Sequence, residues 1–246
     1  MLPIGAKLTV TATALLIVLS AAATGMAAAA DEQICDVTAD FALGVEDYPR
    51  AIILHRKLLE SHRNDALAHY HLGFAYGMVG QRAEEVTEYL EAAALGLHKW
   101  DLFLNLGLAY LEQQQLAKAA AAFETAVSLG PEHAETHLNL AIVYERERKL
   151  REALQEITAS RRLAPEDPEA GNTNAIICAE MGDLACARDI WITLVRTVPD
   201  YTPARANLLI LGSSSEAIAS DTTSLTHGCY RSPSPWSSSR LTRTNR

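Results

Sequence analysis

Residues 104–144 read LNLGLAYLEQQQLAKAAAAFETAVSLGPEHAETHLNLAIVY, and this stretch contains one pattern twice. Leu106-Gly107 recurs as Leu140-Ala141, and Tyr110 recurs as Tyr144, each after 34 residues. Recurrence at a fixed interval of this length is typical of repeat proteins whose unit is a pair of helices joined by a turn. The interval therefore predicts an all-α chain built from repeated helix pairs.

The same register continues without a gap from residue 66 to residue 199. Five sets of positions recur at 34-residue intervals: Leu72-Gly73, Leu106-Gly107, Leu140-Ala141 and Asn174-Ala175; Tyr76, Tyr110, Tyr144 and Cys178; Ala119, Ala153 and Ala187; Tyr89, Phe123, Ile157 and Trp191; Pro131, Pro165 and Pro199. This order of residues resembles the tetratricopeptide repeat (TPR) family. The resemblance implies an α-solenoid of antiparallel helix pairs, a TPR superhelix of about four full repeats with capping helices.

The register also divides the chain into segments. They are a signal peptide or retained anchor (1–30), an N-terminal capping helix pair (31–65), four repeats (66–99, 100–133, 134–167 and 168–201), a C-terminal capping helix (202–212) and a tail (213–246). The tail is rich in Ser and Arg and poor in apolar residues, so it is expected to be disordered because it cannot form a packed core.

The first 30 residues have the order of a secretory signal. Lys7 precedes an apolar run from Leu8 to Leu19, and small residues follow up to Ala30. A positive end, a short apolar run and a small-residue cleavage site direct export. We therefore expect a periplasmic or secreted protein. The alternative is an inner-membrane anchor formed by residues 8–30, since about 20 apolar residues can span a bilayer; membrane contact is expected only in that case.

The charge distribution argues against a nucleic-acid ligand. The chain has a net charge of -9, and residues 31–212 contain 28 acidic and 16 basic side chains, a net charge of -12. An acidic body with dispersed Lys and Arg offers no basic face for a phosphate backbone. The sequence also lacks a phosphate loop, a dinucleotide fingerprint and a nucleophile elbow. We therefore expect no enzyme activity and no cofactor.

Small residues predict close contact between the two helices of each unit. Gly73 and Gly107 are expected to face the recurrent alanines of the second helix, such as Ala119, because only small side chains let two helices approach closely. Leu97 occupies the place where later units have Pro. This departure predicts a longer or looser joint at residues 96–98.

Histidine pairs and cysteines were the remaining candidates for chemistry. His133 and His137 lie at helical i, i+4 spacing, but Glu135 is one position too late for the H-E-x-x-H zinc motif. His69 and His137 recur two periods apart, which favours a structural role, and no metal site is predicted. Cys178 and Cys186 flank a turn and could form a disulfide across it; the alternative is two small buried side chains.

By resemblance, the positions two before and two after each leucine place line a concave, partner-binding groove. They are Tyr70 and Phe74, Leu104 and Leu108, Leu138 and Ile142, and Asn172 and Ile176. The predicted groove is mostly apolar. Asn105 and Asn139 could add amide pairs to a bound backbone, an arrangement that the sequence leaves open.

The sequence therefore predicts a non-enzymatic scaffold that binds protein or peptide segments during assembly or maturation of the cell envelope. Two alternatives remain at this point: an accessory or substrate-recognition subunit of an envelope enzyme or transferase, and a module that associates with itself. The sequence does not indicate the oligomeric state.

Overall fold

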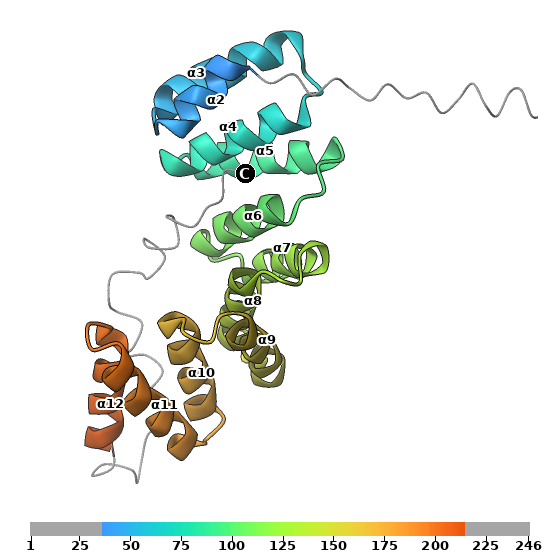
Figure 1. Cartoon of the computed structure of the whole chain (residues 1–246). Coiled ribbons are helices and arrows are strands. Elements are labelled where there is room, and N and C mark those ends of the chain that lie inside the picture. The colour runs from blue at the N-terminus through green and yellow to red at the C-terminus, as the bar shows by residue number, and fades with distance from the viewer. Residues whose placement is uncertain (1–35, 215–246) are drawn as a thin grey trace, which may run out of the picture. The chain divides into compact units, whose positions relative to one another are not determined.

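A computed structural model describes residues 36–214, without the side chains of residues 213 and 214. The predicted signal segment and the tail beyond Ser214 lie outside the described residues. Eleven helices and no strand form the described part, as predicted for an α-solenoid (Figure 1). They are α2 (Val37–Gly44), α3 (Tyr48–Ser61), α4 (Ala66–Met78), α5 (Arg82–Ala94), α6 (Trp100–Glu112), α7 (Leu116–Leu129), α8 (Ala134–Arg146), α9 (Leu150–Leu163), α10 (Pro168–Glu180), α11 (Leu184–Thr197) and α12 (Thr202–Ser214).

Helix starts and ends follow from local sequence. The carboxylate of Asp65 accepts hydrogen bonds from the backbone N–H of Leu67 and Ala68, both at 3.0 Å, and so caps α4. Asp167 caps α10 in the same way, and Pro168 takes the first helical position, where its missing N–H costs nothing. Helices α7, α9 and α11 each end two residues before a recurrent proline, which disfavours helix at the residue before it.

The joint between α5 and α6 confirms the expected irregularity. It comprises residues 95–99, one residue more than the joints that precede α4, α8 and α10. Helix α5 is correspondingly one residue shorter than α7, so the 34-residue register is preserved. Leu97 turns into the core and is 8% exposed, which explains how an apolar residue replaces the proline of the later joints.

The turn inside each helix pair places one residue in the left-handed region of backbone conformation. The positions recur every 34 residues: Glu46, Gly80, Gln114, Arg148 and Gly182, with φ between 59° and 89°. Glycine adopts this conformation without strain, whereas other residues adopt it at a cost. The turn geometry is therefore repeated even where the sequence does not supply glycine.

Within a unit, the glycine of the first helix packs against an aromatic ring of the second. A Cβ added to Gly107 would lie 2.5 to 2.9 Å from atoms of the Phe123 ring, and one added to Gly73 would lie 2.7 Å from the Tyr89 ring. The atoms nearest these glycines belong to the rings, and the expected contact with the recurrent alanines stays a prediction. A ring is wider than a methyl group, so the helix opposite it must present only backbone.

Between successive units, the second helix of one packs most extensively on the first helix of the next, and the first helices also contact one another. Helix α4 contacts α6, α6 contacts α8, and α8 contacts α10, whereas the second helices α5, α7, α9 and α11 make no mutual contact of that extent within the described residues. The first helices therefore form one continuous face, as Figure 1 allows the reader to follow. Between residues 36 and 214, no helix has the length and apolar character needed to cross a membrane.

Replacing Gly107 with leucine should destabilise the protein. Phe123 is fully buried, so its ring cannot move aside, and overpacking of this kind costs about 1 to 3 kcal/mol in free energy of unfolding. Urea denaturation would measure this loss, with Gly107→Ala giving a smaller one. Gly44→Ala is the matched control, because no atom lies within 4 Å of its added Cβ. An unchanged melting curve for Gly107→Leu would contradict this packing.

Replacing Gln114 with glycine should stabilise the protein. Gln114 is exposed and has a φ of 59°, and relief of left-handed backbone strain contributes about 1 kcal/mol. Gly182→Ala at the equivalent position should lower stability by a similar amount. Thermal unfolding of the two variants should thus shift in opposite directions. Equal shifts in the same direction would show that the turn is not strained.

Candidate functional site

The side chains predicted to line a groove belong to the first helices α4, α6, α8 and α10. Six of these eight side chains are less than a tenth exposed: Tyr70, Phe74, Leu104, Leu108, Leu138 and Ile142. The other two, Asn172 and Ile176 on α10, are partly exposed. The groove therefore stays a prediction, and α10 is where this face is most accessible.

The buried members of this set hold neighbouring units together. Tyr70, Leu104 and Leu108 belong to one apolar cluster that spans α2 to α8. Leu138 and Ile142 belong to a second cluster, with residues of α9 and α10. The Tyr70 ring lies 5.9 Å from the Tyr89 ring, measured between centroids. These side chains therefore contribute to packing between helices.

The asparagines of this face form hydrogen bonds within the chain. Asn105 donates to the Tyr70 hydroxyl at 3.3 Å, and Asn139 donates to the backbone carbonyl of Glu135 at 2.9 Å. The Oδ1 atom of Asn172 accepts from the Trp191 indole at 2.9 Å and from Asn207 at 3.0 Å. If these asparagine amides also bound the backbone of a peptide, they would have to do so while keeping, or after breaking, these hydrogen bonds within the chain.

An acidic row crosses the same face and was not identified from the sequence. Asp101, Glu135 and Glu169 occupy equivalent positions of α6, α8 and α10, 34 residues apart. Burial raises the pKa of Asp101. Burial, together with the negative charges of Asp167 and Glu135, raises the pKa of Glu169 to about 7. Their shared interval was the sequence signal that could have revealed the row.

His69 and His137 make equivalent contacts, each of which connects the two helices of its unit. Nδ1 of His69 lies 2.6 Å from a carboxylate oxygen of Glu88, and Nε2 lies 3.0 Å from the Arg63 carbonyl oxygen. His137 repeats both distances with Glu156 and Pro131. Burial disfavours the charged ring of His69, but the hydrogen bonds to Glu88 and Arg63 raise its pKa overall. These contacts agree with the structural role inferred from the spacing of the two histidines.

Arginines near the turns bind glutamates that end the first helix of the next unit. Arg82 donates to Glu85 at 2.9 Å and pairs with Glu112 at the end of α6. Arg148 pairs with Glu180 at the end of α10 at 2.7 Å. Glu180 is largely buried, and loss of one partner of a buried ion pair is strongly destabilising. The ion pairs therefore fix one unit against the next.

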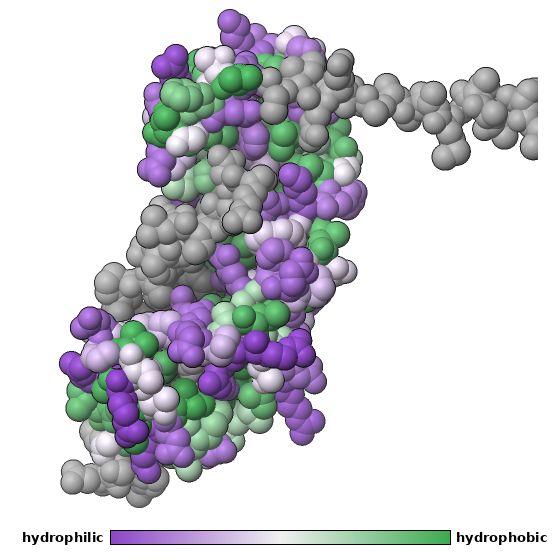
Figure 2. Space-filling model, in the orientation of Figure 1, coloured by the Kyte–Doolittle hydropathy of each residue, from purple (hydrophilic) through white to green (hydrophobic). Residues whose placement is uncertain are grey.

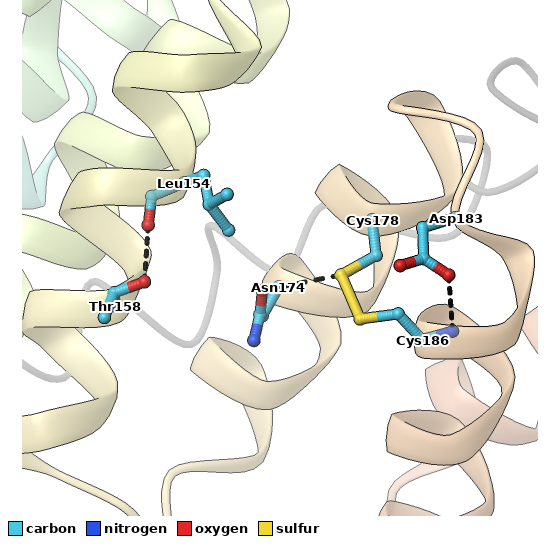
Figure 3. Close-up of a disulfide and its surroundings, with 6 residues drawn as sticks. All are labelled: Leu154, Thr158, Asn174, Cys178, Asp183 and Cys186. Atoms are coloured by element: carbon cyan, nitrogen blue, oxygen red, sulfur yellow. Dashed lines mark hydrogen bonds between the residues drawn. A yellow bond between two sulfur atoms is a disulfide. The ribbon is translucent and has the colours of Figure 1, made fainter.

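Cys178 and Cys186 are joined by a disulfide across the turn between α10 and α11 (Figure 3). Their Cα atoms are 6.1 Å apart, within the range that a disulfide spans. Asp183 caps α11 by accepting from the Cys186 N–H at 2.9 Å, so it fixes the backbone beside the bridge. The bridge links the two helices of the last full unit.

Hydrophilic and hydrophobic residues are interspersed over the surface of the described helices that Figure 2 shows. Among the described residues, the large apolar side chains that are more than half exposed are Val37 and Phe41 of α2, Val45 just after α2, Ile53 of α3 and Leu209 of α12. Exposed apolar side chains thus occur at both ends of the described residues, whereas Ile176 and Glu169 of α10 are partly exposed.

Comparisons with known proteins agree with this description. A family model described as "Tetratricopeptide repeat" matches residues 104–168. No curated protein matches the sequence. Among solved structures, YrrB, described as a TPR protein with an unusual peptide-binding site, is 20% identical with a TM-score of 0.65, and the match covers 81% of this chain and 97% of that one.

A structure of MamA is 18% identical with a TM-score of 0.60, and the match covers 64% of this chain and 91% of that one. MamA from Desulfovibrio magneticus RS-1 is 17% identical with a TM-score of 0.61, and the match covers 65% of this chain and 90% of that one. At these identities the likeness shows the fold.

Glu169 should make the stability of the protein depend on pH. A carboxyl whose pKa is raised from 4.5 to about 7 by folding favours the folded state at low pH, and that contribution is lost as the pH rises from about 4.5 to 7. Glu169→Gln removes this loss. Its melting temperature should exceed that of the wild type by roughly 3 °C at pH 8, which corresponds to about 1 kcal/mol in a domain of this size, and should equal it at pH 4. Glu166→Gln, an exposed neighbour, is the control. A constant difference at all pH values would contradict the raised pKa.

Proposed function

Because residues 104–168 are tetratricopeptide repeats and residues 36–214 have the fold of that family, we propose that this chain is a non-enzymatic scaffold that binds segments of other proteins. The observation that carries the proposal is the direct contact of α4 with α6, α6 with α8 and α8 with α10. Helices aligned in this way present equivalent positions at regular intervals, which suits an extended peptide or a helix.

The chemistry of this face indicates what kind of segment it binds. Apolar side chains such as Ile176 would contact apolar side chains of the partner. Glu169 is partly exposed on α10 and has a raised pKa, so a Lys or Arg of the partner would favour its ionised form. The proposed ligand is therefore a segment that carries apolar and basic side chains. The peptide-binding site named for YrrB supports this class of ligand.

We further propose that the protein acts outside the cytoplasm, in assembly or maturation of the cell envelope. The order of Lys7, the apolar run and Ala30 supports export. The disulfide between Cys178 and Cys186 is compatible with an oxidising compartment, where such bonds persist. The histidines and arginines that connect the helices have structural partners, which supports a binding role over a catalytic one.

The test is site-specific photo-crosslinking in cells that make the full chain. A photo-reactive residue at Ile176 should capture a partner segment, and one at Thr158, exposed on α9, should not. The captured segment is identified by mass spectrometry, synthesised and titrated against purified protein. Ile176→Arg should weaken its binding at least about tenfold, or 1.4 kcal/mol. Because Ile176 also packs against an apolar cluster of α10, α11 and α12, thermal unfolding of the variant checks that it is folded at the temperature of the titration.

Two results would contradict this function. One is equal capture from Thr158, which would place the contact on the second helices. The other is unchanged affinity of the synthetic segment for Ile176→Arg, since that side chain lies on the proposed binding face.

A further inference from the structure

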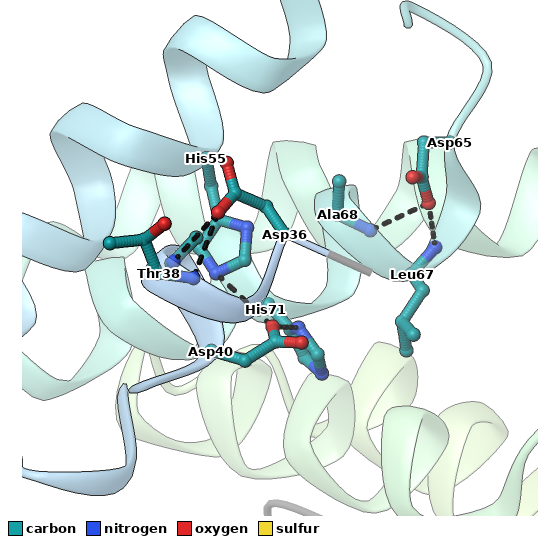
Figure 4. Close-up of polar contacts among 9 residues, drawn as sticks. Asp36, Thr38, Asp40, His55, Asp65, Leu67, Ala68 and His71 are labelled. Atoms are coloured by element: carbon teal, nitrogen blue, oxygen red, sulfur yellow. Dashed lines mark hydrogen bonds and ion pairs between the residues drawn. The ribbon is translucent and has the colours of Figure 1, made fainter. Parts of the chain in front are cut away.

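Three helices at the start of the described chain bring together two imidazoles and a carboxylate. Asp40 comes from α2, His55 from α3 and His71 from α4, as Figure 4 shows. Oδ1 of Asp40 lies 3.0 Å from Nδ1 of His71 and 4.0 Å from Nε2 of His55. The three donor atoms that these side chains offer all lie within 4.8 Å of one another.

His55 is the member of the cluster that packing does not explain. It is 1% exposed, and neither ring nitrogen has a hydrogen-bond partner. A buried polar group without a partner is costly, and native proteins usually provide one. The ring centroids of His55 and His71 are 5.3 Å apart, so His55 directs its unpartnered polar edge at the other two side chains (Figure 4).

We propose that Asp40, His55 and His71 bind one Zn²⁺ ion. Imidazole nitrogen and carboxylate oxygen are ordinary zinc ligands, and three protein ligands leave the fourth position to water. Bond lengths of about 2.0 to 2.1 Å in a tetrahedral site place neighbouring ligand atoms about 3.3 Å apart. The two distances from Asp40, 3.0 and 4.0 Å, bracket that value. All three donor atoms lie within 4.8 Å of one another, so rotation of the side chains toward a common ion would complete the site.

The electrostatics of the cluster are suited to a cation. Burial and the neighbouring His71 lower the pKa of His55 to about 4, and burial lowers the pKa of His71. Burial therefore disfavours the protonated form of both rings, and a metal binds the neutral form. Asp36 and Asp65 also face His55, and Lys99 is the cation that acts on His71.

A metal at this position would join the N-terminal helix pair to the first full repeat. Helix α2 has only eight residues, and Asp40 is its only residue in the cluster. Because the three residues lie 15 and 16 positions apart on separate helices, no short metal-binding motif marks them in the sequence. The inference does not depend on the proposed peptide binding.

The test is titration of ZnCl₂ into the full, metal-free chain without a histidine tag, by calorimetry at pH 7. We expect one equivalent to bind, a rise in melting temperature, and the ligand-field absorption of tetrahedral Co²⁺ when Co²⁺ replaces Zn²⁺. His55→Gln, His71→Ala and Asp40→Asn should each weaken binding by more than the roughly 10- to 100-fold that loss of an outer-shell partner costs. His98→Ala, an exposed histidine outside the cluster, should bind as the wild type does.

Asp40→Asn keeps the test decisive if a histidine variant fails to fold, because the Asp40 side chain is one-third exposed. Circular dichroism of the metal-free variants checks their folding. Absence of stoichiometric Zn²⁺ binding to the wild type would overturn the proposal. So would stoichiometric binding that is unchanged in Asp40→Asn and in the folded histidine variants, because the ion would then be bound elsewhere.

Discussion

The close approach of two helices at a residue without a side chain determines the rest of this structure. Gly73 and Gly107 lie against the rings of Tyr89 and Phe123, so the helix axes can come near while a large apolar ring is buried between them. Ala141 occupies the equivalent place in the next unit. Since each unit must present this pair at the same separation in sequence, the other contacts recur with the same 34-residue interval.

The recurrence made the helices predictable from sequence, because capping residues, prolines and small residues act locally. Contacts between chain segments were less predictable. The partner of His69 is 19 residues away on another helix, and spacing alone showed only that the histidine recurs. The left-handed turn positions were missed because Gln114 and Arg148 occupy places that Gly80 and Gly182 mark in other units. The 34-residue interval predicted where the helices alternate, but it did not show which atoms of neighbouring helices are in contact.

The predicted binding residues illustrate the same limit. Family resemblance assigned Leu104 and Leu138 to a binding face, and both side chains are buried in the structure. An apolar side chain between neighbouring first helices contributes to the packing of both units, and the sequence does not show how much of it remains accessible. Side chains that can reach a partner therefore lie where the packing between helices is incomplete. Ile176 and the acidic Glu169 on α10 meet that description.

Incomplete packing also explains why polar chemistry gathers at the first described helices. An internal unit has a neighbour on each side, whereas α2 has eight residues and buries only Ala39, Ala42 and Leu43. A helix of this length is not stable without tertiary contacts. Asp40 lies within hydrogen-bond distance of His71, and this contact connects α2 to α4. The buried His55 still has no hydrogen-bond partner. One ion coordinated by all three side chains would give His55 a partner and attach α2 and α3 to α4. Its binding free energy would stabilise this end of the protein, as buried apolar surface stabilises the contacts between the later units.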